Sequence, residues 1–328
     1  MALLEVKNLK VDYPLRGSWF AKRKFLHAVD DVSFTIERGE TVGLVGESGC
    51  GKSSIAKALV RLEEPASGSI HIAGTDISKL QGKALRKARK KFQMVFQDPY
   101  GSLNPRLSIQ STLDEVLALH TTLGKAERLK RMQELMTMVG LAPGQLGRYP
   151  HEFSGGQRQR IGIARALATE PELLIADEPV SALDVSVQAS IINLLKDLQK
   201  STGIGLLFIA HDLAVVEHIS SRILVMYLGR VVESAPAEEL CSKPLHPYTA
   251  ALLSAVPALE NRSSERIKLA GDVPSPLAPP AGCAFHPRCI YASEKCRSCR
   301  PELREIAPGR FSACFRVQEN EVFSCEKP

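Results

Sequence analysis

Aromatic residues are scarce in this sequence: they make up 5% of its 328 residues, and there is one tryptophan. Proteins that bind single-stranded nucleic acid stack the bases on aromatic side chains, and this chain offers few such platforms. The net charge of +6 is mildly basic, and an anionic small molecule or a membrane surface would suit it as well as nucleic acid would. We therefore expect no nucleic-acid partner.

Long uncharged apolar runs are also lacking. None reaches the roughly 18 residues that cross a bilayer. The first residues, MALLEVKNLKVDYP, carry acidic and basic side chains too early for a secretory signal. Hydrophobic residues still make up 44% of the chain, which is enough for a large core and, by length, about two domains. We expect a protein that is soluble or is held at a membrane by a partner.

Short apolar strands alternate with helices through most of the chain. Residues 41–46 (TVGLVG), 173–177 (LLIAD) and 205–210 (GLLFIA) are typical of buried strands, while residues 52–62 and 186–200 are typical of helices. This alternation predicts an α/β fold with a mainly parallel sheet that is covered on both faces.

Other segments complete the expected organisation. Strands are expected on either side of a basic loop at 14–26, hairpins at 67–77 and 221–235, a solvated basic helix at 79–91, and mostly helices over 108–170. The composition becomes rich in proline and cysteine near residue 257. We therefore expect a first domain over 1–256, with a helical subdomain at about 98–170, and a linker and Cys-rich extension over 257–328.

One segment has the pattern of a phosphate-binding loop. GESGCGKS, at 46–53, fits G-x-x-x-x-G-K-[ST] and lies between an expected strand and an expected helix. Its glycines let the backbone wrap around phosphates, Lys52 reaches the β- and γ-phosphates, and Ser53 offers a hydroxyl to Mg²⁺. The expected ATP-binding residues are Gly46, Glu47, Ser48, Gly49, Cys50, Gly51, Lys52, Ser53 and Ser54.

Polar residues end three other apolar segments. Asp177 ends LLIAD and is placed to hold Mg²⁺ through water, and Glu178 beside it can orient or deprotonate an attacking water. Gln97 follows FQMVF, and His211 follows GLLFIA. Ligands collect at the carboxyl ends of strands in such sheets, which favours a functional role for all four.

A second glycine turn precedes a helix at FSGGQRQR, residues 153–160. The free N–H groups and the positive end of a helix dipole make such a turn an anion site. Five motifs follow one another along the chain: GESGCGKS, FQDPYGSLNP, FSGGQRQR, ADEPVSALD and IAHD. Together they resemble the nucleotide-binding subunit of an ATP-binding-cassette (ABC) transporter. The segments MYLGRVVE and HPYTAALLSAVP are similar to segments of the dipeptide and oligopeptide importer branch. The insertion at 14–26 is most similar to that of the dipeptide-permease ATPase subunit of F type.

The resemblance implies a P-loop NTPase (RecA-like) core with an antiparallel β subdomain, an α-helical subdomain and a small Cys-rich C-terminal extension. It also implies that two cassettes pack head to tail, each closing over the ATP of the other. The residues that would serve the partner's ATP are Ser154, Gly155, Gly156, Gln157 and Asp184.

The resemblance assigns further roles around the chain's own ATP. Lys52, Gln97, Glu178 and His211 would form the catalytic set, with Ser53, Gln97 and Asp177 on Mg²⁺. Tyr13 would stack on adenine, with Phe20 and Phe25 as alternatives.

The implied activity is ATP hydrolysis that powers import of dipeptides or oligopeptides. The implied partners are a second ABC ATPase chain in a heterodimer, two transmembrane permease subunits and, indirectly, an extracytoplasmic peptide-binding protein. The chain would lie on the cytoplasmic face of the inner membrane. An importer for nickel or another small solute uses the same motifs, and a soluble ABC ATPase of repair or translation is a further alternative.

Six of the eight cysteines lie between Cys283 and Cys325. A disulfide framework would not suit a cytosolic chain. A zinc ribbon requires two C-x-x-C pairs, and this chain has one. Buried free thiols are a further alternative. Related importer subunits have a similar Cys pattern, and some bind a [4Fe–4S] cluster there. The resemblance implies Cys283, Cys289, Cys296 and Cys314 as its ligands, with Cys299 competing with Cys296.

Overall fold

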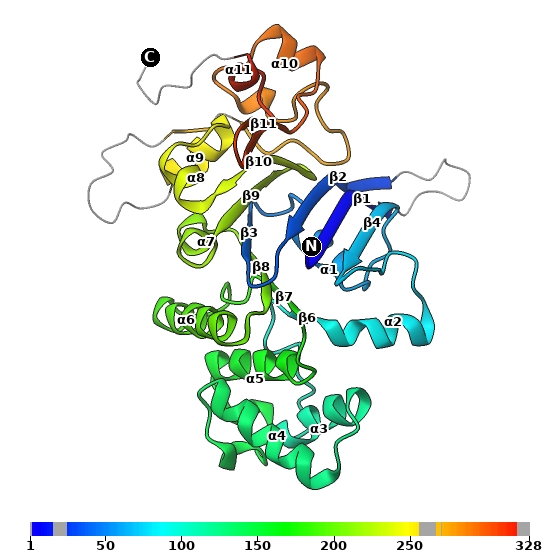
Figure 1. The fold of residues 1–328 in the computed structure, drawn as a ribbon. Coiled ribbons are helices and arrows are strands. Elements are labelled where there is room, and N and C mark those ends of the chain that lie inside the picture. Colours follow the sequence, from blue (N-terminus) through cyan, green and yellow to red (C-terminus); the bar gives the residue numbers. More distant parts are fainter. Residues whose placement is uncertain (1, 16–24, 256–266, 270, 320–328) are drawn as a thin grey trace.

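In the computed structural model the described residues are 2–15, 25–255, 267–269 and 271–319. Phe20 and Cys325 lie outside these ranges. The molecule is elongated, with a helical lobe at one end, the sheets in the middle and the C-terminal extension at the other end (Figure 1).

Within the described residues, the main sheet has the strand order β11-β12-β10-β9-β3-β8-β7-β6 (Figure 1). Its strands are β3 (Thr41–Val45), β6 (Phe92–Val95), β7 (Leu173–Asp177), β8 (Gly205–Ala210), β9 (Arg222–Tyr227), β10 (Arg230–Pro236), β11 (Arg304–Ala307) and β12 (Arg310–Ser312). The pairs β9–β3, β3–β8, β8–β7 and β7–β6 are parallel, and the remaining pairs are antiparallel. The predicted mainly parallel sheet is confirmed.

Side chains alternate between the two faces of this sheet, and each face is buried. Along β8, Leu206 and Phe208 pack into one apolar cluster, and Leu207 and Ile209 pack into another. The first cluster includes residues of α6 (Val185–Thr202), α7 (Leu213–Ile219) and the helical lobe. The second includes residues of α1 (Lys52–Leu59) and of the smaller sheet. A strand that is buried on both faces needs the continuous apolar sequence that the chain has here.

The smaller sheet is antiparallel, with the order β2-β1-β4-β5. Its strands are β1 (Leu4–Pro14), β2 (Phe25–Ile36), β4 (Ser67–Ile72) and β5 (Thr75–Asp76). The predicted hairpin at 67–77 is confirmed. The predicted loop at 14–26 is too long at both edges, because Pro14 and Phe25 are paired in the ladder.

The helical lobe follows β6 and ends before β7. It consists of α3 (Ile109–His120), α4 (Lys125–Met138), the 3₁₀ turns η2 (Pro143–Gln145) and η3 (Pro150–Glu152), and α5 (Gly155–Leu167). The basic segment is α2 (Gly82–Ala88) with η1 (Arg89–Lys91), and no residue of it is buried. None of the described helices is both long and apolar enough to cross a membrane.

The C-terminal extension is joined to the main sheet. It contains η4 (His286–Arg288), α10 (Glu294–Ser298), β11, β12 and α11 (Phe315–Gln318), and it follows α8 (Ala237–Ser242) and α9 (Pro247–Ala255). Strand β12 pairs with β10 through Glu233 and Ser312, so the eight-stranded sheet runs from the cassette into the extension. The sequence pattern gave no sign of strands there.

An aromatic side chain from the extension also enters the core. Phe285 is 2% exposed, and its ring lies 5.3 Å from that of Tyr227 in an edge-to-face arrangement and 5.4 Å from that of Tyr248. Such aromatic pairs add stability beyond the area that they bury. The extension is therefore anchored both by strand pairing and by a buried ring.

We predict that Phe285→Ala lowers the free energy of unfolding by about 3–5 kcal/mol, because it removes a buried ring and leaves a cavity. Chemical denaturation of the full chain measures this change. Leu277→Ala is the matched control, since Leu277 is 56% exposed. If the two variants unfold at the same denaturant concentration, the extension is not part of the core.

Candidate functional site

The phosphate loop connects the buried strand β3 with helix α1. Gly49 and Gly51 have φ values of 79° and 108°, which favour glycine, and a Cβ on Gly51 would lie 2.2 Å from the Ala28 carbonyl oxygen. Ser48 and Gly49 form the exposed crest of the loop. The backbone is thus shaped to present N–H groups to an anion, as helix-opening glycine loops do.

Lysine 52 lies inside this loop and is buried. Its Nζ donates hydrogen bonds to the carbonyl oxygens of Gly46 at 2.7 Å and Glu47 at 3.1 Å. The Lys52 ammonium therefore lies at the concave side of the loop. Cys50 is also buried, and burial raises the pKa of its thiol, so it packs as a neutral group.

Two of the three expected Mg²⁺ ligands, Ser53 and Asp177, meet at the foot of the loop, whereas the third, Gln97, contacts Glu178. Ser53 Oγ donates a hydrogen bond to Asp177 Oδ1 at 3.1 Å, and Asp177 is 4% exposed. Burial raises the pKa of Asp177, while the hydrogen bond from Ser53 works against that rise. A hydroxyl and a carboxylate are oxygen ligands of the kind that a hard cation prefers, so the donor set fits Mg²⁺.

Two polar side chains that follow separate strands meet at the Glu178 carboxylate. Gln97 Nε2 donates to Glu178 Oε2 at 2.8 Å, and His211 Nδ1 lies 3.8 Å from the same oxygen. These residues follow β6, β7 and β8, which are parallel neighbours, so their carboxyl ends open on one edge. Glu178 has a φ of 44°, a conformation that is unusual for a non-glycine residue and is found more often at functional sites.

Tyrosine 13 lies close to the same loop. Its hydroxyl donates to Ser54 Oγ at 3.3 Å, and Ser54 is in the first turn of α1. Phe25, the alternative at the start of β2, is 45% exposed. Tyr13 thus has a fixed position beside the phosphate loop.

The SGGQ segment forms the N-terminus of α5. Ser154 Oγ accepts a hydrogen bond from the backbone N–H of Gln157, and Gln157 Oε1 accepts one from that of Ser154, which is a capping box. In Figure 1, α5 lies apart from α1 and its phosphate loop. The structure therefore does not bring this segment to the chain's own phosphate site.

The SGGQ segment lies against the start of α6. A Cβ on Gly156 would lie 2.4 Å from Val187 Cγ1, so any larger residue there would displace the Val187 side chain. Asp184 occupies the N-cap position of α6 and is exposed, and the next residue, Val185, is 81% exposed. These neighbouring segments form one exposed surface of glycine, polar and apolar groups.

A groove of about 710 Å³ separates the Gln97 segment from the helical lobe. Its lining includes the apolar side chains of Phe96 and Val116 and the polar ones of Gln97 and His120. Ser53 and Asp177 line its other end. The groove therefore reaches from α3 of the helical lobe to Ser53 and Asp177.

Four of the extension's cysteines line one cavity of about 20 Å³: Cys283, Cys289, Cys296 and Cys314. Burial raises the pKa of Cys283 to about 11 and that of Cys289 to about 12. Cys299 is exposed and does not line this cavity. Among the described residues, no three His, Cys, Asp or Glu side chains are arranged to hold a single metal ion.

The backbone around these cysteines is tightly packed. Gly282 has a φ of 67°, and a Cβ there would lie 2.4 Å from the Cys296 carbonyl oxygen. That oxygen accepts a hydrogen bond from the backbone N–H of Cys283 at 2.8 Å. Two of the four cysteines are thus held together by their own backbone.

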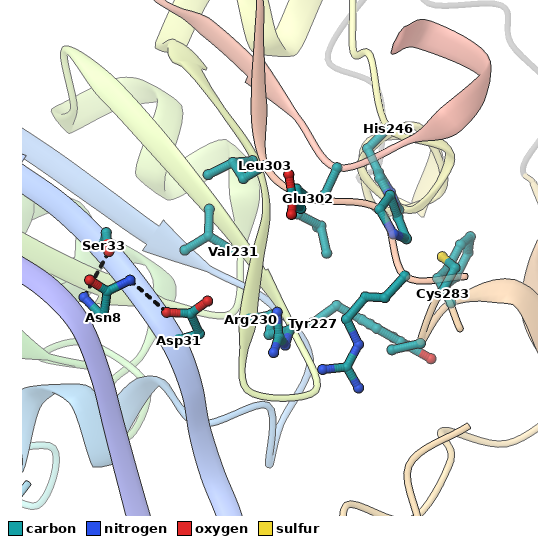
Figure 2. Close-up of a pocket in the computed structure, with 16 residues that line it drawn as sticks. Asn8, Asp31, Ser33, Tyr227, Arg230, Val231, His246, Cys283, Glu302 and Leu303 are labelled. Atoms are coloured by element: carbon teal, nitrogen blue, oxygen red, sulfur yellow. Dashed lines mark hydrogen bonds between the residues drawn. The ribbon is translucent and has the colours of Figure 1, made fainter. Parts of the chain in front are cut away.

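Another cavity, of about 360 Å³, lies between the extension and strands β2 and β10 (Figure 2). Its charged lining residues are already paired with protein groups: Arg230 and Arg300 with Asp30, Glu302 with Arg304, and Asp31 with Asn8. We assign no ligand to this cavity.

Two residues beside the phosphate loop were missed by the sequence reasoning. Arg288 forms a two-fold hydrogen bond with Glu47, and the Tyr248 hydroxyl accepts a hydrogen bond from the backbone N–H of Glu47. Tyr248 belongs to the HPYTAALLSAVP segment, which was noticed only as a mark of resemblance. Arg288 lies 241 residues from Glu47 and carries no local signal.

The loop, the helix that it opens and the polar strand ends define a P-loop nucleotide-binding protein. Comparison with known proteins narrows this class. Residues 29–181 match the ABC transporter family model, and residues 232–296 match that of the oligopeptide/dipeptide transporter C-terminal region.

Similar curated proteins cover nearly the whole chain. The oligopeptide transport ATP-binding protein AppF of Bacillus subtilis is 52% identical over 317 residues, which is 95% of this chain and 96% of AppF. The dipeptide transport ATP-binding protein DppF of Haemophilus influenzae is 50% identical over 316 residues, 96% of this chain and 97% of DppF. The chain belongs to the ABC transporter ATP-binding protein family.

Solved structures agree with this family. A dimeric ATP-binding cassette, MJ0796, in a post-hydrolysis state with ADP and phosphate has a TM-score of 0.63 and 30% identity. It covers 71% of this chain, and 98% of the cassette is matched. The cassette cbiO1 of Clostridium perfringens also has a TM-score of 0.63, with 28% identity over 74% of this chain and 91% of its own.

Proposed function

We propose that this chain binds and hydrolyses ATP to power the import of dipeptides or oligopeptides through a membrane permease. The observation that carries this proposal is the convergence of Gln97, Glu178 and His211 on one strand edge, beside a phosphate loop whose Ser53 meets Asp177. AppF and DppF are about as long as this chain, and their names as oligopeptide and dipeptide transport proteins support a peptide substrate.

Each residue of the ATP site has a distinct role in this proposal. Lys52 and the loop N–H groups bind the β- and γ-phosphates. Ser53 and Asp177 would hold Mg²⁺, which supplies charge to offset that of the phosphates. Glu178 orients and deprotonates the attacking water, Gln97 fixes the Glu178 carboxylate, and His211 contacts the γ-phosphate.

The SGGQ segment serves a second ATPase chain. Ser154 begins α5 and is exposed, and its helix N-terminus suits a phosphate that comes from outside the chain. MJ0796, which is similar to this chain, is described as dimeric. ATP bound between a loop and such a segment would draw the two chains together, and hydrolysis would release them. A heterodimer with a sibling ATPase chain is the assembly that we propose.

The permease docks at the groove beside Gln97. Phe96 is 38% exposed there, and an apolar lining next to polar groups suits a short protein segment. Docking at this groove would place the chain on the cytoplasmic face of the inner membrane. A permease that moves in the groove would act on Gln97 and hence on Glu178.

We predict that Glu178→Gln lowers ATP turnover of the assembled transporter by about 100-fold or more, because it removes the general base. ATP binding is retained, since Glu178 does not hold the phosphates. Phosphate release and nucleotide binding measure the two quantities. Glu172→Gln is the matched control, because Glu172 precedes the first residue of β7, whereas Glu178 follows its last. We expect this variant to turn over ATP at the parent rate. Unchanged turnover in Glu178→Gln would refute the assignment.

We also propose that the four cysteines around the small cavity would hold a [4Fe–4S] cluster, for which this cavity of about 20 Å³ would have to widen. Thiolates are the usual ligands of such clusters, and four thiols share the cavity. A single zinc ion is less favoured, because no three His, Cys, Asp or Glu side chains of the described residues are arranged to hold one metal ion. The role of the cluster would be structural, because ATP hydrolysis needs no electron carrier.

Metal analysis of anaerobically purified chain tests the cluster. We expect about four iron and four sulfide per chain, lost in Cys296→Ser and kept in the control Cys299→Ser, whose thiol is exposed. Zinc alone, no metal, or loss of iron only in Cys299→Ser would contradict the assignment.

A further inference from the structure

Every polar group of Glu47 in the phosphate loop has a hydrogen-bond partner in the chain. The backbone N–H donates to the Tyr248 hydroxyl at 2.9 Å, and the carbonyl oxygen accepts from Lys52 Nζ at 3.1 Å. The carboxylate accepts from Arg288 Nη1 at 2.8 Å and from Nη2 at 3.1 Å. Two of these three attachments come from beyond the cassette's last strand, β10.

The Arg288–Glu47 pair is largely removed from water. The Arg288 side chain is 9% exposed and that of Glu47 is 26% exposed. The hydrogen bonds to Glu47 raise the pKa of the Arg288 guanidinium, which therefore stays charged. A bidentate fork of this kind fixes geometry as well as charge. Glu47 is thus both oriented and neutralised.

Neutralisation matters because of where Glu47 lies. It is the second residue of a loop whose task is to receive the negatively charged phosphates of ATP. An unpaired carboxylate at this position would repel them, and the repulsion would be strong because the surroundings are poorly hydrated. The positive charge that offsets it comes from the C-terminal extension.

The extension is built to hold Arg288 in place. Arg288 ends η4, between Cys283 and Cys289, and Phe285 begins the same turn. The Phe285 ring packs against Tyr227 and Tyr248, whose own rings are 4.7 Å apart. Figure 2 shows Tyr227 and Cys283 on the wall of the neighbouring cavity. Burial raises the pKa of Tyr248, so its hydroxyl remains neutral beside Glu47.

We propose that Arg288 is a positioning residue for ATP binding: it holds and neutralises Glu47, so the C-terminal extension acts on the phosphate loop without touching the nucleotide. This inference rests on the proposed ATP site and goes beyond it. The rival explanation is a structural tie that only stabilises the extension. The two differ in what happens when the Glu47 carboxylate is removed as well.

The test is Mg-ATP binding to the full chain, measured by calorimetry. We expect Arg288→Ala to raise the dissociation constant about tenfold or more, because it leaves a partly buried carboxylate unpaired beside the phosphates. Arg288→Lys keeps the charge but loses the fork, so a smaller rise is expected. Arg304→Ala is the matched control, since Arg304 is an exposed arginine of the same extension that pairs with Glu302.

The deciding variant combines Arg288→Ala with Glu47→Gln. Removing the carboxylate recovers most of the lost affinity if Arg288 acts through the charge of Glu47. A structural tie predicts that the double variant binds ATP as weakly as Arg288→Ala does. In the assembled transporter, Arg288→Ala raises KM for ATP more than it lowers kcat, because the catalytic carboxylate is untouched.

Three results would overturn the inference: parent-like ATP affinity in Arg288→Ala, no recovery in the double variant, or an equal loss in Arg304→Ala. If Arg288→Ala does not fold, parent-like affinity in Arg288→Lys would overturn it in the same way. Lys52→Ala tests the proposed ATP site separately from the role of Arg288, because ATP binding that survives in that variant would refute the ATP site itself.

Discussion

The parallel alignment of β3, β8, β7 and β6 is the constraint on which the site depends. Parallel neighbours put all their carboxyl ends on one edge, so residues that are far apart in sequence come together there. The phosphate loop follows β3, His211 follows β8, Glu178 follows β7 and Gln97 follows β6. Burial of both sheet faces stabilises these parallel strands, since their continuous apolar sequences pack into one apolar cluster on each side of the sheet.

The phosphate loop is supported from two directions. From within the cassette, Gly51 lies against the backbone of Ala28, and Gly229 donates to the Cys50 carbonyl oxygen. From the chain that follows β10, Tyr248 of α9 and Arg288 of the extension hold Glu47. Loops that receive phosphate groups must be preorganised, because ordering them during binding costs affinity. The extension contributes to that order, and the segment that carries Arg288 also carries two of the cavity's cysteines.

Much of this site could be predicted because its signals are local. The phosphate loop, the acidic pair after β7 and the capped SGGQ turn are each fixed by a few neighbouring residues. The buried strands and the hairpin of β9 and β10 were predicted for the same reason, from apolar runs that glycine or proline bounds. The relatives AppF and DppF are named as oligopeptide and dipeptide transport proteins, which agrees with the resemblance drawn from the motifs.

What could not be predicted depends on distant contacts or on unusual backbone. The Arg288–Glu47 pair joins residues 241 positions apart, and β12 is too short to show a pattern. Helix α1 ends at Leu59 rather than near Leu62, because Arg61 adopts a φ of 57° where glycine is the usual signal. The spacing of the cysteines alone does not place four of them around one cavity, and that set was implied by the resemblance, with Cys299 competing with Cys296.

The central claim is that the chain holds its own ATP at the phosphate loop and serves a partner's ATP with the SGGQ segment. Nucleotide binding by isolated Ser154→Arg chain and ATP turnover of the transporter that contains it test this most directly. The account predicts parent-like ATP affinity in the isolated chain and a loss of at least about half of the turnover, because at least one site of the assembly loses its phosphate donors. Weakened ATP binding by the isolated chain, or full turnover in the assembly, would contradict it.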